Sequence, residues 1–321
     1  MNPGGFQHIY GPVPSRRLGR SLGVDLVPLK TCSYDCVYCQ LGRTTRKTVE
    51  RGEYVPVAEV LEELGRKLAD GDSPDTISLA GSGEPTLNSG IGALIRGIKE
   101  RTAIPVAVLT NGSLLRMDEV REDLMPADLV LPSLDAGDET LFRYVNRPHK
   151  DISFERMVDG IAAFAGSFPG EVWLEVFLLA GVTGLPSEAK RIADAARRIA
   201  PARLQLNTVS RPPVEEYACA VSGKRLDALK GIFPGIVDVL NESGGEDFRT
   251  SLLSGVREED ILGLLGRRPC TFQDVAGGLG IHATEAIKGL DALAAAGKVK
   301  SVLAGGRTFY SIAERKGAPG T

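Results

Sequence analysis

The sequence predicts an α/β protein in which an open or partial (β/α) barrel is followed by a small second domain. Short apolar runs alternate with helical segments over roughly the first two thirds of the chain. Parallel neighbouring strands need helical crossovers, so this alternation predicts a parallel sheet. The last part of the chain instead carries three helical segments and two strand-like runs. A chain of 321 residues is long enough for one large domain and one small one.

Six strands and the helices between them define the predicted barrel. The strands are predicted at residues 22–27, 76–80, 105–109, 128–132, 172–179 and 203–209. The helices carry apolar residues at intervals of three and four and are predicted at 57–68, 91–99, 118–124, 154–164 and 187–199. Ser187 is predicted to cap the last of these helices. With a further helix predicted at 222–233 after the sixth strand, six β–α units in a row predict a barrel domain over residues 1–240.

The chain changes character after this domain. Residues 241–255 are rich in Gly, Ser and acidic residues and read as a linker, and residues 314–321 read as a flexible tail. Between them we predict helices at 258–266, after Thr271 and at 283–296, and strands at 298–303 and 307–312. Gly305 and Gly306 suit the tight turn of a β-hairpin. This order of elements resembles a winged helix-turn-helix domain over residues 256–313. Its third helix is poor in base-reading side chains, which favours docking of RNA or a peptide over DNA.

Three of the five cysteines, Cys32, Cys36 and Cys39, lie within eight residues at the spacing C-x3-C-x2-C. Three thiolates can hold three irons of a [4Fe–4S] cube and leave the fourth iron open for chemistry. A structural zinc site would need four protein ligands, and the nearest histidines are His8 and His149. A disulfide framework suits short secreted chains, and the N-terminus shows no secretory signal. The spacing therefore predicts an open iron–sulfur cluster.

With Tyr38 directly before Cys39, this motif resembles the cluster motif of the radical S-adenosylmethionine (radical SAM) superfamily. The resemblance implies a partial barrel of six units, a [4Fe–4S] cluster held by Cys32, Cys36 and Cys39, and SAM on the open iron. In that family, one electron from the cluster cleaves SAM to methionine and a 5′-deoxyadenosyl radical, which abstracts hydrogen from a substrate. A reducing donor of the flavodoxin or ferredoxin type is therefore an expected partner.

Several loop residues are predicted to contact SAM, because the loops that follow parallel strands meet at one rim of the sheet. Residues 81–86 resemble the family's Gly-Gly-Glu-Pro motif with Ser82 inserted, and Glu84 is expected to pair with the amino group of SAM. Ser133 is the preferred partner for the ribose, and Tyr38 is expected either beside the adenine or packed over the cluster. The full set of predicted contacts is Tyr38, Gly81, Gly83, Glu84, Asn111, Ser133 and Asp135.

Two further features each keep two interpretations. Glu175 lies in the middle of a predicted strand, where it would point toward substrate or form an ion pair with an arginine. The segment 143–149 carries Arg143, Asn146, Arg147 and His149, which would bind an anion or form a solvated loop.

Together these features predict a radical SAM enzyme, an oxidoreductase or transferase, acting on an unidentified substrate. The segment 11–20 is similar to the branch that includes the tRNA wybutosine-synthesis enzymes, although the chain lacks a second cysteine set of the kind those enzymes use. The winged-helix-like domain would recruit an RNA or peptide substrate. The alternative is a redox-sensing regulator that binds DNA, but such a sensor has no need for the SAM pocket predicted around residues 81–86.

Composition agrees with an ordinary globular protein. Hydrophobic residues make up 43% and charged residues 25%, and the net charge of -3 gives no overall sign of nucleic-acid binding. The most apolar stretch, 172–182, is interrupted by Glu175 and is too short to span a bilayer. Free thiols and the lack of a targeting segment predict a cytoplasmic, oxygen-sensitive protein without a membrane partner.

Overall fold

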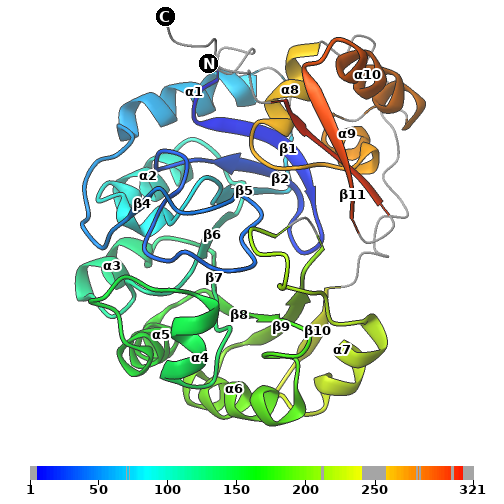
Figure 1. The fold of residues 1–321 in the computed structure, drawn as a ribbon. Helices are drawn as coiled ribbons and strands as arrows, with labels where there is room; N and C mark the ends of the chain where they lie inside the picture. Colours follow the sequence, from blue (N-terminus) through cyan, green and yellow to red (C-terminus); the bar gives the residue numbers. More distant parts are fainter. Residues whose placement is uncertain are drawn as a thin grey trace, which may run out of the picture.

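The computed structural model describes residues 6–69, 71, 73–210, 213–240, 258–279, 281, 283–304 and 307–313 (Figure 1). The predicted linker at 241–255, the predicted tail at 314–321, and Gly305 and Gly306 lie outside the described residues.

An eight-stranded sheet forms the centre of the molecule. In spatial order its strands are β1 (Ile9–Ser15), β2 (Gly19–Val24), β5 (Thr76–Leu79), β6 (Val106–Thr110), β7 (Leu129–Pro132), β8 (Glu171–Leu178), β9 (Arg203–Thr208) and β10 (Val237–Val239). β1 pairs with β2 in antiparallel fashion, and every other neighbouring pair is parallel. The predicted α/β fold with a mostly parallel sheet is therefore confirmed. Because the sheet also contains β1 and β10, the six-unit barrel stays a prediction.

Helices cover the outside of this sheet (Figure 1). They are α1 (Val57–Ala69), α2 (Ile91–Lys99), α3 (Asp118–Leu124), α4 (Glu139–Val145), α5 (Phe154–Ser167), α6 (Pro186–Ile199) and α7 (Gly223–Lys230), with a 3-10 turn η1 (Pro85–Leu87). The predicted cap at Ser187 is wrong: α6 begins one residue earlier at Pro186, whose fixed φ suits a first turn, and its N-cap is Leu185. α4 was not predicted from the sequence; its N-cap Asp138 accepts a hydrogen bond from Leu141 N at 2.9 Å.

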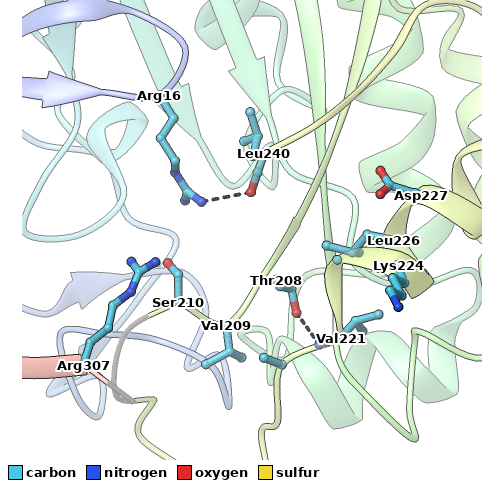
Figure 2. Close-up of a pocket in the computed structure, with 12 residues that line it drawn as sticks. Arg16, Thr208, Val209, Ser210, Val221, Lys224, Leu226, Asp227, Leu240 and Arg307 are labelled. Carbon is cyan, nitrogen blue, oxygen red and sulfur yellow. Dashed lines mark hydrogen bonds between the residues drawn. The ribbon is translucent and has the colours of Figure 1, made fainter. Parts of the chain in front are cut away.

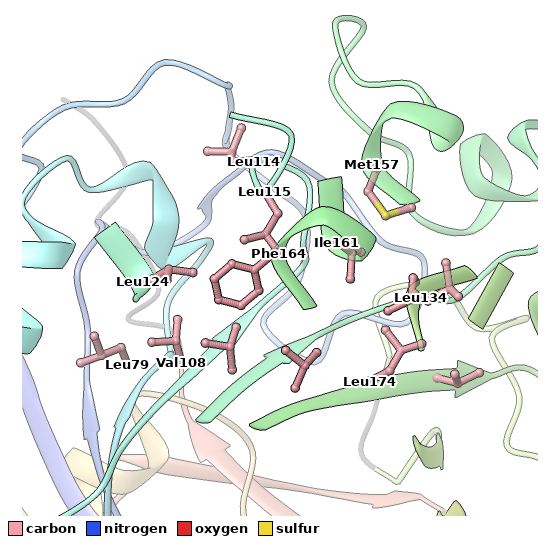
Figure 3. Close-up of a cluster of buried hydrophobic side chains, with 14 of the residues drawn as sticks. Leu79, Val108, Leu114, Leu115, Leu124, Leu134, Met157, Ile161, Phe164 and Leu174 are labelled. Carbon is pink, nitrogen blue, oxygen red and sulfur yellow. The ribbon is translucent and has the colours of Figure 1, made fainter. Parts of the chain in front are cut away.

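The main core lies between the sheet and these helices. Leu79, Val108 and Leu174 from the strands pack with Leu124 of α3 and Phe164 of α5, all fully buried (Figure 3). β8 alternates buried residues with half-buried ones, so one of its faces packs on the helices and the other faces the interior of the sheet's curve. Glu175 belongs to that second face.

A second unit follows, with its own smaller core around Val275 and Leu290. Its elements are α8 (Glu258–Leu265), α9 (Phe272–Leu279), α10 (Ala283–Ala295) and the antiparallel hairpin of β11 (Val299–Ala304) and β12 (Arg307–Ile312). The predicted cap at Thr271 is confirmed, because its Oγ1 accepts from Asp274 N while the Asp274 carboxylate accepts from Thr271 N. α9 packs beside β1 (Figure 1). The elements match the predicted order, and the winged-helix interpretation stays a prediction.

None of the described helices combines the length and apolar character that a membrane crossing requires.

Candidate functional site

The cysteine loop follows β2 and begins at the short strand β3 (Thr31–Cys32), which pairs with β4 (Arg46–Lys47). All three cysteines are free and half-buried. The loop is tied to the end of α4, because Asp35 N donates to Asn146 O at 3.0 Å and Val37 N donates to Val145 O at 2.9 Å. The end of α4 therefore holds the loop at the C-terminal rim of the sheet.

Each thiol lies near a polar donor from another part of the structure. The side-chain amide of Asn111 donates to Sγ of Cys32 at 3.6 Å, and that of Asn146 donates to Sγ of Cys36 at 3.5 Å. The ammonium group of Lys30 lies 3.0 Å from Sγ of Cys39. Hydrogen bonds to ligand sulfurs are a main determinant of the reduction potential of an iron–sulfur cluster.

Burial raises the pKa of the Cys32 thiol to about 12, with a further contribution from the nearby Glu84 carboxylate. Burial also raises the pKa of Cys36, with Asp135 adding to the effect. Thiols in such surroundings ionise only when a strong positive charge compensates the thiolate, and metal binding supplies that charge.

The chemistry of the donor set suits a [4Fe–4S] cluster. Within the described ranges, no three His, Cys, Asp or Glu side chains converge as the ligands of one metal ion. A cube presents its irons at separate corners, so its three thiolate ligands have no need to converge on one point. Three soft sulfur donors on one loop, each with a polar neighbour, suit such a cube.

Gly81 and Gly83 follow β5 and are required by close packing of the protein on itself. Gly81 has φ of +120°, and a Cβ there would lie 1.8 Å from the Asp25 carboxylate. A Cβ on Gly83 would lie 1.8 Å from the carbonyl oxygen of Thr31. Both glycines are predicted SAM contacts, and their close neighbours in this structure are Asp25 and Thr31 of β3.

Glu84 joins η1 to the end of β6. Its side chain belongs to a residue only 2% exposed, and it accepts hydrogen bonds from Thr86 N at 3.1 Å, Thr110 Oγ1 at 2.6 Å and Asn111 N at 2.7 Å. Burial raises the pKa of Glu84, and these donors counteract that rise. The Oε2 oxygen of Glu84 accepts the hydrogen bond from the Asn111 backbone amide. A carboxylate oxygen can accept hydrogen bonds from more than one donor.

The remaining predicted contacts gather around Asp135, just beyond β7. Asp135 accepts from the Tyr38 hydroxyl, from Asn146 Nδ2 at 2.7 Å and from Phe177 N at 3.1 Å, and its burial raises its pKa. The Tyr38 ring stacks on Phe177 with centroids 4.0 Å apart. Ser133 is half-buried, and its amide donates to Thr110 O at 3.2 Å. The structure thus brings Tyr38 and Asp135 together and places Ser133 beside the end of β6.

Glu175 forms an ion pair with Arg17, from the turn between β1 and β2. Gln205 and Asn207 of β9 complete this network, at 3.3 Å from Arg17 and 3.4 Å from Glu175 respectively. The structure therefore favours the ion-pair interpretation of Glu175.

The segment 143–149 divides its side chains among protein partners. Arg143 pairs with Glu139, and Arg147 pairs with Glu215 at 2.6 Å. His149 lies 3.5 Å from Asp151, and Asn146 faces the cysteine loop. Sequence reasoning missed Asn146 and Lys30 as sulfur neighbours; only the position of Lys30, two residues before Cys32, was a signal.

The chain matches one family model and several relatives of known sequence. The family model described as the Radical SAM superfamily matches residues 26–184, which include every predicted site residue. The chain is 34% identical over 267 residues to a UPF0026 protein of Methanocaldococcus jannaschii, covering 81% of this chain and 82% of that protein. It is likewise 34% identical over 271 residues to a UPF0026 protein of Helicobacter pylori strain J99, covering 83% and 86%. A protein named GTPase Obg from Brachyspira hyodysenteriae is 38% identical over 307 residues. The match covers 95% of this chain but only 45% of that protein.

Among solved structures, a radical SAM methyltransferase from Sphaerobacter thermophilus superposes with a TM-score of 0.53 at 17% identity, covering 68% of this chain and 66% of that one. SuiB from Streptococcus suis gives a TM-score of 0.51 at 16% identity, covering 75% and 54%. At this level of identity the likeness establishes the fold alone. These comparisons give no support to a DNA-binding redox regulator.

Proposed function

Because the chain belongs to the UPF0026 family and to the radical SAM superfamily, whose members use a [4Fe–4S] cluster and SAM, we propose that Cys32, Cys36 and Cys39 hold that cluster. When bound, the cluster would supply the electron for cleavage of SAM to methionine and a 5′-deoxyadenosyl radical, and that radical would abstract hydrogen from a substrate. The observation that carries the proposal is the juxtaposition of three half-buried thiols with Asn111, Asn146 and Lys30.

The chain's own residues have distinct proposed roles around SAM. Gly81, Gly83 and Glu84 set the shape of the loop after β5, and the Oε2 atom of Glu84 has capacity to accept the SAM ammonium group. Ser133 is the proposed ribose contact, and Asn111, whose side-chain amide donates to Sγ of Cys32, is a further proposed SAM contact. Asp135 orients Tyr38 and Asn146, so its proposed role is positioning.

The reaction needs a reducing donor, and we propose a small flavodoxin- or ferredoxin-type protein. The proposed substrate is macromolecular, an RNA or a peptide, docked in part by the C-terminal unit of three helices and a hairpin.

The decisive experiment measures 5′-deoxyadenosine formed from SAM by the anaerobically reconstituted, dithionite-reduced protein. Cys36→Ala is expected to lose most of its iron and sulfide and all product formation. Cys219→Ala is the matched control, because Cys219 is an exposed thiol outside the loop, and it should retain both. Full iron and sulfide content in Cys36→Ala would overturn the ligand assignment. Absence of product from a fully loaded wild type would overturn the proposed SAM cleavage.

A further inference from the structure

A pocket of about 410 Å³ lies beside the end of β9, between α7 and the start of β12 (Figure 2). This volume lies in the usual range for small-molecule sites. Its walls come from distant parts of the sequence: the β1–β2 turn, the segment after β9, α7 and the hairpin of the second unit. The mechanism proposed above uses none of these residues.

The pocket is positively charged. Arg16, Lys224 and Arg307 line it, each from a different segment, and Asp227 is the one acidic side chain among its described lining residues (Figure 2). Cations that reach one pocket from three separate elements suit a ligand with more than one negative charge, as a phosphate group has.

Arg16 is held in place before any ligand binds. Its guanidinium donates to Leu240 O at 3.1 Å and to Asn207 Oδ1 at 3.3 Å, while the residue as a whole stays exposed. A guanidinium carries five N–H donors in a fixed fork, a shape that matches the oxygens of a phosphate group. Fixing the side chain in advance lowers the entropic cost of binding.

The rest of the lining divides into a polar and an apolar part. Thr208 Oγ1 is used by the protein, since it donates to Leu178 O at 2.7 Å and accepts from Val221 N at 2.8 Å. Ser210 lies close to Arg307 and offers a hydroxyl (Figure 2). Val209 and Val221 add apolar surface, on which a nucleobase or sugar can pack.

We propose that this pocket binds the phosphate group of a nucleotide that belongs to the substrate. The β11–β12 hairpin and the β9 end of the main sheet hold this phosphate between them. Calling the ligand a substrate rests on the proposed radical chemistry, whereas the binding itself does not. The shared chemistry is a phosphate with an attached nucleoside, supplied either by a free nucleotide or by an RNA chain.

The test is equilibrium binding of two probes, AMP and a short single-stranded RNA, to the full chain under anaerobic conditions. Lys224→Glu and Arg307→Glu are each expected to weaken binding at least tenfold, because each loses a charge-assisted contact worth about 1.4 kcal/mol or more. Lys230→Glu is the matched control, since it makes the same charge change at the opposite end of α7, and it should bind like the wild type.

Tight binding of AMP would identify a free nucleotide as the source, and tight binding of RNA alone would identify an RNA chain. Binding of neither probe, or equal affinity in Lys224→Glu, Arg307→Glu and the control, would overturn the proposal. Probe binding without 5′-deoxyadenosine formation would sink the proposed function and leave the pocket standing. Product formation without probe binding would overturn the pocket proposal and leave the proposed function standing.

Discussion

Lys30 is a buried cation within the cysteine motif. Its residue is 6% exposed, and its ammonium group lies 3.0 Å from Sγ of Cys39. A cation at a ligand sulfur stabilises the more negative, reduced state of a cluster. We expect Lys30→Met to lower the midpoint potential by about 60 mV, because a charge-assisted hydrogen bond is worth about 1.5 kcal/mol and the couple transfers one electron. A redox titration followed by electron paramagnetic resonance measures this shift.

Lys47→Met is the control for that measurement. Lys47 is exposed and donates to Arg147 O at 3.2 Å, so its loss should leave the potential unchanged. An unchanged potential in Lys30→Met would mean that Lys30 does not act on the cluster.

The packing around Gly83 leaves no room for a Cβ atom at this position. A Cβ at this position would lie 1.8 Å from the Thr31 carbonyl oxygen, and that backbone leads directly into Cys32. We expect Gly83→Ala to lower the free energy of unfolding by about 2–3 kcal/mol, since overpacked sites must displace backbone. Urea denaturation measures the change. Gly65→Ala is the contrasting variant: it has open space around it in α1 and should stabilise by up to about 1 kcal/mol. Equal effects of the two substitutions would contradict the packing account.

At the scale of elements, the turn between β1 and β2 is linked to β8 and β9, which are not neighbours of β1 or β2 in the sheet. Arg17 from this turn pairs with Glu175 of β8 and lies 3.3 Å from Gln205 of β9. Burial, with Arg16 nearby, lowers the pKa of Arg17 to about 10, so the side chain remains charged at neutral pH. We expect Arg17→Ala to destabilise by about 3–5 kcal/mol in denaturant unfolding, because it leaves Glu175 half-buried without its partner.

The control for Arg17 is an exposed ion pair of the same type. Arg198 bridges Glu155 at 2.9 Å and Asp159 at 2.7 Å on the outer helices, and Arg198→Ala should cost less than about 1 kcal/mol. A small effect of Arg17→Ala, comparable to that of Arg198→Ala, would show that the turn is not held by this pair.

The elements that could be predicted were those with a strong apolar pattern. Strands such as β6 and helices such as α1 bury residues in a fixed period, and the sequence displays that period. β1 was missed because it is an edge strand with Pro12 and Pro14, and β10 because it has three residues. The loops of the site could be placed because the ends of parallel strands share one rim. The position of the Asn146 side-chain amide could not be predicted, because its direction depends on how α4 docks on the cysteine loop.

At the scale of the whole molecule, one arginine links the second unit to the proposed SAM loop. Arg267, between α8 and α9, forms an ion pair with Asp25, donates to Gln7 O at 2.9 Å and lies 5.1 Å from the Tyr10 ring. Asp25 is 3% exposed and accepts from both the amide and the hydroxyl of Ser82, at 2.8 and 3.0 Å. The residues predicted to contact SAM all precede residue 215, yet one of their loops depends on a carboxylate that the second unit neutralises.

This contact predicts that Arg267→Ala weakens SAM binding as well as interdomain packing. Without the guanidinium, Asp25 is a buried charge whose partner is gone, which costs about 3–5 kcal/mol, and Ser82 loses its fixed acceptor when Asp25 moves toward water. We expect roughly tenfold weaker SAM binding by equilibrium dialysis and faster limited proteolysis of the full chain. Lys300→Ala, an exposed substitution on β11, should change neither SAM binding nor proteolysis.

Adding Asp25→Asn to Arg267→Ala removes the buried, unpaired charge while keeping an acceptor for Ser82, so SAM affinity should largely return. If SAM affinity stayed at the wild-type value in Arg267→Ala while proteolysis accelerated, the second unit would act on docking alone and the link to the SAM loop would be wrong.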